Sequence, residues 1–147
     1  MLENIVYNNK LIAIILLNKY KADGVVFFTP DDFSQQLAYI HHQIGRIIEP
    51  HVHNLVKREV QYTQEVLFIK KGKIRVDFYD DDEIYIKSRI LEEGDVLLLA
   101  SGGHGFEVIE EIEMIEVKQG PYAGGADKKH FKNIGTSNLK LNGKGNA

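Results

Sequence analysis

The chain has 147 residues, a formal net charge of −3 at pH 7 and no cysteine, and 44% of its residues are hydrophobic. That length suits about one domain with a sizeable core, and the composition excludes an intrinsically disordered chain. Without cysteine there is neither a disulfide framework nor a thiolate metal site, and without an arginine-rich stripe we expect no nucleic-acid partner.

The N-terminal residues predict neither a leader nor a membrane anchor. The stretch MLENIVYNNKL has no basic region followed by an apolar stretch and a small-residue cleavage site, which a secretory signal would require. The longest apolar run, residues 11–17, has seven residues, whereas a spanning helix needs about 20. We therefore expect a cytoplasmic protein with no membrane partner.

The first third of the chain predicts two apolar strands and a short helical turn. Residues 9–20 (NKLIAIILLNKY) and 24–30 (GVVFFTP) are rich in branched or aromatic residues and are bounded by Asn, Asp, Gly and Pro, which is typical of strands. Thr29 then offers a capping hydroxyl, Pro30 suits a first helical turn, and two acids follow. This pattern predicts one helical turn near residues 30–35.

From about residue 36 to residue 120 the chain predicts strand after strand. Turn signals fall at residues 70–73, 80–83, 92–95, 101–103 and 110–113. Residues 65–69 (EVLFI) and 95–100 (DVLLLA) are apolar at successive positions, so these strands need cover on both faces. Many short antiparallel strands indicate an all-β sandwich or small barrel.

Alternation is clearest in residues 73–79 (KIRVDFY). Ile74, Val76 and Phe78 form an apolar face, and Lys73, Arg75 and Asp77 form a polar one, because successive side chains on a strand point to opposite faces. We expect one domain over residues 1–131 with its barrel at about 36–120, and a flexible tail at 132–147, where apolar residues are few. The apolar N-terminal strands and the two-faced strands favour a homodimer.

Two histidines and a glutamate suggest a metal site. His51 and His53 follow Pro50 one residue apart, so on a strand they share a face. Glu65 begins the EVLFI run and points with Leu67 and Ile69. If those two line a core, a cation is one of the few ways to satisfy the carboxylate. The alternatives are surface histidines, a solvated Glu65, or Glu59 as the carboxylate ligand.

His104 supplies a fourth group. It heads a strand after a glycine pair and shares a face with Phe106 and Val108, and flanking glycines permit close backbone approach. A lone histidine so placed is more often a hydrogen-bonded core residue. The adjacent His41 and His42 face opposite ways on a strand and are interpreted as structural.

These residues resemble the two motifs of the cupin superfamily over about residues 45–118. His51, His53 and Glu65, with Gly45 six residues before His51, match the first motif, and His104 matches the second. The resemblance implies a cupin-type antiparallel jelly-roll barrel, here with extra N-terminal strands and the short helical turn. It also implies a divalent metal held by these three histidines and Glu65.

The match has departures from the family pattern. Eleven residues, NLVKREVQYTQ, separate His53 from Glu65, against roughly three or four in the family; a loop of that kind adds little closure cost. In the second motif Ala100 stands at the proline position and Val108 at the closing asparagine position, and the spacing from Gly94 to His104 is one residue short.

Three imidazoles and a carboxylate suit Fe, Mn, Ni, Cu or Zn. The resulting prediction is a small-molecule cupin metalloprotein, an enzyme acting on an oxygen-rich anion such as a sugar derivative or keto acid. In this role Glu65 is a fixed ligand or a proton acceptor, and Tyr62 is a phenol donor. The candidate substrate-binding residues are Lys57, Arg58, Lys118 and Tyr122.

Two alternatives differ in class. The first is a metal-free cupin isomerase or epimerase of nucleotide-linked sugars, in which His51 or His53 would be the base and Tyr62 or Tyr122 the acid. The second is a non-catalytic barrel that binds a small-molecule ligand. Metal content and turnover separate these three functions.

Overall fold

A computed structural model describes residues 1–141 of the chain. By their contacts the residues fall into two compact units. The first unit comprises Met1–Tyr20 and Thr63–Ala147, and the second comprises Lys21–Tyr62.

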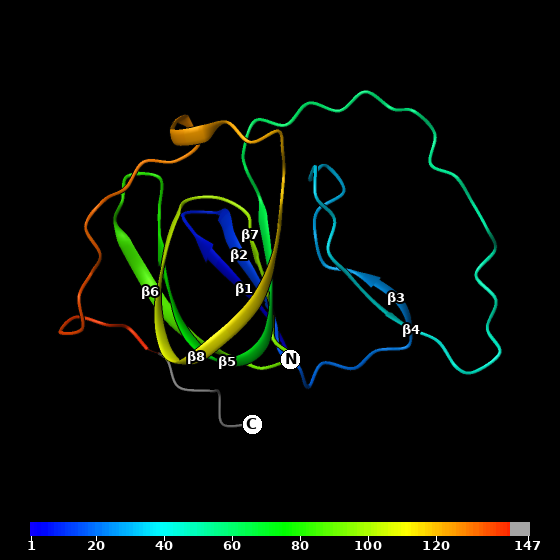
Figure 1. The fold of residues 1–147 in the computed structure, drawn as a ribbon, viewed down its shortest axis with the longest axis horizontal. Helices are drawn as coiled ribbons and strands as arrows, with labels where there is room; N and C mark the ends of the chain where they lie inside the picture. Colours follow the sequence, from blue (N-terminus) through cyan, green and yellow to red (C-terminus); the bar gives the residue numbers. More distant parts are fainter. Residues whose placement is uncertain (142–147) are drawn as a thin grey trace. The chain divides into compact units, whose positions relative to one another are not determined.

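The first unit is built on one antiparallel sheet of six strands that curls on itself (Figure 1). The strands are β1 (Leu2–Tyr7), β2 (Lys10–Leu16), β5 (Glu65–Tyr79), β6 (Tyr85–Glu92), β7 (Val96–Leu99) and β8 (Gly103–Lys118). They are hydrogen-bonded in the order β1-β2-β7-β5-β6, and β8 also pairs with β5. The prediction of an all-β protein is therefore confirmed, with the sheet forming a curled half-barrel; the cupin jelly roll remains a prediction.

The curl depends on two long bent strands. The predicted turns at 70–73 and 110–113 are wrong, because β5 and β8 each run through them without a break. The two segments lie opposite each other, and the pairing shifts register there. Gly72 has a φ of 87°, and a Cβ on it would lie 1.9 Å from the carbonyl oxygen of Glu111. A side chain is therefore incompatible with this close approach, and glycine permits the bend.

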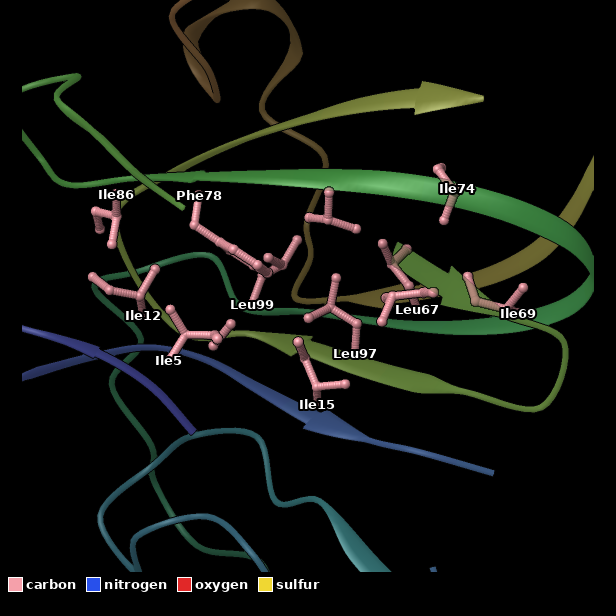
Figure 2. Packing of buried hydrophobic residues seen from close by; sticks show 13 residues of the cluster. Ile5, Ile12, Ile15, Leu67, Ile69, Ile74, Phe78, Ile86, Leu97 and Leu99 are labelled. Atoms are coloured by element: carbon pink, nitrogen blue, oxygen red, sulfur yellow. The ribbon is translucent and has the colours of Figure 1, made fainter. Parts of the chain in front are cut away.

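The inner face of the curled sheet carries the hydrophobic core (Figure 2). Its 13 buried residues come from β1, β2, β5, β6 and β7. They include the alternating set Leu67, Ile69, Ile74, Val76 and Phe78 of β5, as the sequence predicts. On β8, by contrast, Phe106 and Val108 are 40% and 56% exposed, so the sheet leaves these two apolar side chains largely uncovered.

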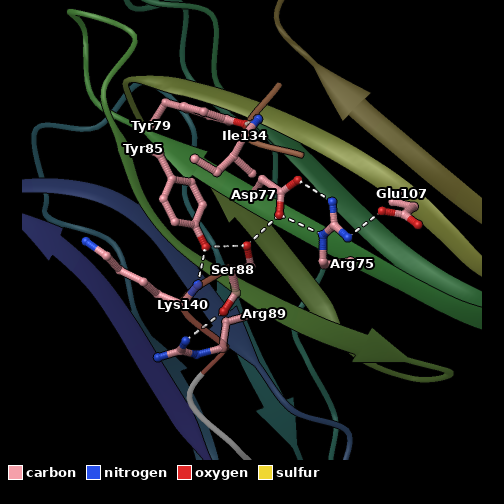
Figure 3. Close-up of polar contacts among 9 residues, drawn as sticks. All are labelled: Arg75, Asp77, Tyr79, Tyr85, Ser88, Arg89, Glu107, Ile134 and Lys140. Atoms are coloured by element: carbon pink, nitrogen blue, oxygen red, sulfur yellow. Dashed lines mark hydrogen bonds and ion pairs between the residues drawn. The ribbon is translucent and has the colours of Figure 1, made fainter. Parts of the chain in front are cut away.

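The outer face of β5 and β6 carries a buried polar network (Figure 3). Arg75 Nε and Nη2 donate to the two carboxylate oxygens of Asp77 at 2.8 and 2.9 Å. Ser88 Oγ, across on β6, donates to Asp77 Oδ1 at 2.5 Å. Arg75 also pairs with Glu107 of β8. The alternating polar face of residues 73–79 is thus buried at Arg75 and Asp77.

The second unit contains one hairpin, β3 (Gly24–Phe27) with β4 (Ala38–His41). The predicted helical turn near residues 30–35 is wrong; Phe33 N–H donates to the Pro30 carbonyl in a turn without a helix. Residues 42–62 contain no strand, so the prediction that His51 and His53 lie on a strand is also wrong. The helical segment of the described residues is a 3₁₀ turn, Gly124–Ala126, and none of their helices is long and apolar enough to cross a membrane.

The C-terminal residues up to 141 pack on the first unit. Phe131 lies edge-on to Tyr79 with ring centroids 5.0 Å apart, and the Lys140 N–H donates to Tyr85 Oη at 2.8 Å. Part of the predicted tail is therefore hydrogen-bonded to the sheet; residues 142–147 lie outside the described residues.

Candidate functional site

Two of the four predicted metal ligands are in contact. Glu65 begins β5 and His104 is the second residue of β8, and Nε2 of His104 lies 3.3 Å from Oε2 of Glu65. Glu65 shares the inner face with Leu67 because the two residues are two apart on a strand. His104 pairs across strands with Phe78, which belongs to the same core.

The pair is partly withdrawn from water. The side chains of Glu65 and His104 are 11% and 31% exposed. The hydrogen bond from His104 lowers the pKa of the Glu65 carboxyl; burial opposes this, and the positive charges of His104, Lys118 and Lys128 assist it. The arrangement therefore favours an ionised Glu65 that can accept a proton or bind a cation.

The chain that follows β8 is tied to the residues that precede Glu65. Gln119 Oε1 accepts the main-chain N–H of Gln64 at 2.5 Å. Asp127 accepts a hydrogen bond from Thr63 Oγ1 at 3.3 Å, and it lies 3.8 Å from the ammonium of Lys118. These contacts hold in place Thr63 and Gln64, the two residues that precede Glu65. Asp127 belongs to no sequence motif, so sequence analysis missed it.

Lys118 occupies the far end of β8, as the cross-strand neighbour of Glu65. Its side chain is 25% exposed, and its ammonium also lies 3.8 Å from Glu116. Of the two predicted substrate-binding residues in the first unit, Lys118 and Tyr122, Lys118 is therefore the one beside Glu65. Tyr122, four residues on, is 81% exposed.

The remaining predicted residues belong to the second unit. His51 and His53 are exposed, with ring centroids 5.3 Å apart and planes at 80°. Lys57, Arg58 and the alternative ligand Glu59 are exposed in the same strandless segment, and Tyr62 is 62% exposed.

The four predicted metal ligands belong to different units: Glu65 and His104 to the first, and His51 and His53 to the second. Among residues 1–141 no group of three or more His, Asp or Glu side chains is placed to hold a metal ion. The carboxylate of Glu65 and the imidazole of His104 are both donors that divalent transition metals accept.

The lowered pKa of Glu65 predicts a pH-dependent stability difference. A carboxyl whose pKa in the folded state lies below its ordinary value of 4.5 stabilises the fold above that value, and this stabilisation is lost as the pH falls through the folded-state pKa. We expect the parent to be more stable than Glu65→Gln at about pH 6, with the difference shrinking toward about pH 3. Urea unfolding over this range measures it.

The same titration in a His104→Ala background provides the control. Because His104 is the largest cause of the lowered pKa, the pH dependence of the difference should become smaller. An unchanged pH dependence would mean that the hydrogen bond between the two side chains does not set this pKa.

Comparison of the chain with models of protein families, with curated proteins and with solved structures finds no match.

Proposed function

We propose that this chain is a small-molecule metalloenzyme of cupin type, with a divalent transition metal held by His51, His53, Glu65 and His104. Its substrate is a small oxygen-rich anion such as a sugar derivative or a keto acid, and the working form is a homodimer. The observation that carries the proposal is the contact between His104 Nε2 and Glu65 Oε2 at 3.3 Å, between residues 39 positions apart in the sequence that the cupin resemblance assigns to one site.

The surroundings of the pair support a role in binding an anion. Lys118 is the cross-strand neighbour of Glu65, and the charge of Lys128 also acts on the Glu65 carboxyl. Two ammonium groups beside a carboxylate–imidazole pair attract a carboxylate or phosphate, each acting as a point charge. A bound metal would supply Lewis-acid polarisation of a substrate oxygen. In this scheme Lys118 orients the anion, and Glu65 accepts or holds a proton at a carboxylate oxygen.

Metal content tests the proposal. We expect untagged protein to contain close to one equivalent of a divalent transition metal by elemental analysis. His104→Ala and the double variant His51→Ala/His53→Ala should each lose most of it, because a four-ligand site that loses one or two donors binds much more weakly. Far-UV circular dichroism shows whether each variant stays folded.

His42→Ala is the matched control, since His42 is exposed and lies outside the predicted ligand set. It should keep the parental metal content. A parent that is empty and takes up none of Fe, Mn, Ni or Zn on reconstitution would overturn the metal site.

A metal-free isomerase or epimerase is the second candidate. The hydrogen bond that lowers the pKa of Glu65 joins a carboxylate to an imidazole, and such a pair can relay a proton between two substrate positions. An empty parent that still turns over a sugar-nucleotide substrate would favour this function. Binding without turnover would favour a ligand-binding barrel.

A further inference from the structure

The last described residues form a strap that pairs with the edge strand β6 and contacts Tyr79 and Tyr85. We call residues 131–141 the C-terminal strap. The main-chain N–H of Ile134 donates to Tyr79 Oη at 3.0 Å, and that of Lys140 donates to Tyr85 Oη at 2.8 Å. Ser88 of β6 in turn donates its N–H to the Lys140 carbonyl at 3.2 Å. Figure 3 shows these residues beside the buried Arg75–Asp77 pair.

The start of the strap is wedged against the start of β8. The ring of Phe131 packs edge-on against Tyr79, and it lies so close to Gly103 that a Cβ added there would be 2.8 Å from the ring. Gly103 is also the cross-strand partner of Tyr79. Phe131, Tyr79 and Gly103 therefore meet at one point, where a Cβ on residue 103 would require the Phe131 ring to move.

That point is one residue from His104. Gly103 is the first residue of β8, and His104 follows it on the opposite face of the strand. The first residues of a strand at the sheet margin are held by few contacts, so they open more readily than its centre. A ring packed on Gly103 restricts the backbone that carries the imidazole.

We propose that Phe131 is a positioning residue for His104, and that docking of the C-terminal strap holds the start of β8 in the geometry that places the imidazole against Glu65. A binding partner or a covalent modification that undocks the strap would therefore change the geometry of the Glu65–His104 pair without contacting either residue. The inference rests on the proposed function in giving His104 a role, but the docking and its effect on the imidazole are measurable without metal or substrate.

Two glycines of β8 provide a matched pair of variants. Neither Gly103 nor Gly105 has a left-handed φ, so alanine is compatible with the backbone at both. In Gly103→Ala the new Cβ would collide with the Phe131 ring, which must move. In Gly105→Ala the nearest atom, Cε2 of Tyr79, is at 3.9 Å, an ordinary contact. The two variants flank His104 and differ in whether they displace the strap.

We expect Gly103→Ala to speed hydrogen exchange at the Ile134 and Lys140 amides by about tenfold, because the undocked strap opens more readily, and to shift the His104 imidazole resonances at fixed pH. Phe131→Ala, which leaves β8 unaltered, should do the same. Gly105→Ala should leave both readouts near the parent. Exchange and imidazole resonances are both followed by NMR on the full chain.

Parental exchange in Gly103→Ala would overturn the docking of Phe131 on Gly103. Faster exchange with unshifted His104 resonances, in either Gly103→Ala or Phe131→Ala, would overturn the positioning of His104. A third readout is zinc affinity, which we expect Phe131→Ala to weaken while Gly105→Ala keeps it. A parent that binds no zinc would count against the proposed metal site and not against the role of the strap, because hydrogen exchange and the His104 resonances decide that role without metal.

Discussion

Replacing Asp77 by alanine is expected to lower the free energy of unfolding by about 3 to 5 kcal/mol. The side chains of Arg75 and Asp77 are 8% and 3% exposed, and two hydrogen bonds join them. Without the carboxylate, a guanidinium stays buried beside Glu107 as its remaining described acidic partner, and Ser88 loses its acceptor. Most of the cost is that of a buried charge left underpaired.

Urea unfolding followed by circular dichroism measures this loss, and an exposed ion pair provides the comparison. Lys71 lies 2.7 Å from Glu111, with side chains 54% and 83% exposed. Lys71→Ala should cost at most about 1 kcal/mol, because water screens such pairs. A loss for Asp77→Ala no larger than that for Lys71→Ala would contradict a buried, energetically coupled network.

Local alternation predicted the inner face of the sheet correctly. The apolar positions Ile74, Val76 and Phe78 are all in the core, and so are Leu67 and Ile69, with which Glu65 was expected to point. These predictions rest on the two-residue period of a strand, which depends on neighbouring residues alone. The turn predicted at residues 92–95 is also present, where Asp95 accepts the N–H of Glu92.

The alternation of polar and apolar residues could not predict which residues satisfy the outer face of β5. The polar positions Arg75 and Asp77 suggest a solvated surface, but Ser88 and Glu107 come from other strands to satisfy them. The strap that pairs with β6 likewise comes largely from residues whose composition predicts a flexible tail. Burial of a polar group depends on partners far along the chain, and the local pattern carries no information about them.

The two wrong turns share a physical cause. KKGK and EEIE have turn-like composition, yet they face each other across β5 and β8. Lys71 and Lys73 pair with Glu111 and Glu110 at 2.7 and 2.9 Å. Opposite charges on adjacent strands favour pairing, and Gly72 permits the bend. Residues that would end a strand by their composition thus stabilise the bend that β5 and β8 share.

The candidate site was predictable only in part. The contact between Glu65 and His104 joins two residues that no local period in the sequence links. Gln119 and Asp127 hold residues 64 and 63 through side-chain hydrogen bonds from the chain that follows β8. Such hydrogen bonds follow no regular sequence spacing, so sequence analysis has no pattern by which to predict them.

Replacing Phe78 by alanine should have the other large effect on stability, a loss of about 3 to 5 kcal/mol. Phe78 is fully buried and is the cross-strand partner of His104. The loss combines the transfer of a phenyl ring to water with the cavity that the surrounding side chains only partly fill. The cavity would open beneath His104, so we also expect this variant to shift the imidazole resonances.

Phe68 on the same strand provides the control for this substitution. It is 41% exposed on the opposite face, so Phe68→Ala should cost about 1 kcal/mol or less. Urea unfolding of the two variants side by side makes the comparison, because residue type, strand and replacement are the same and only burial differs. Equal losses would mean that the inner face of the curled sheet is not the packed core on which His104 depends.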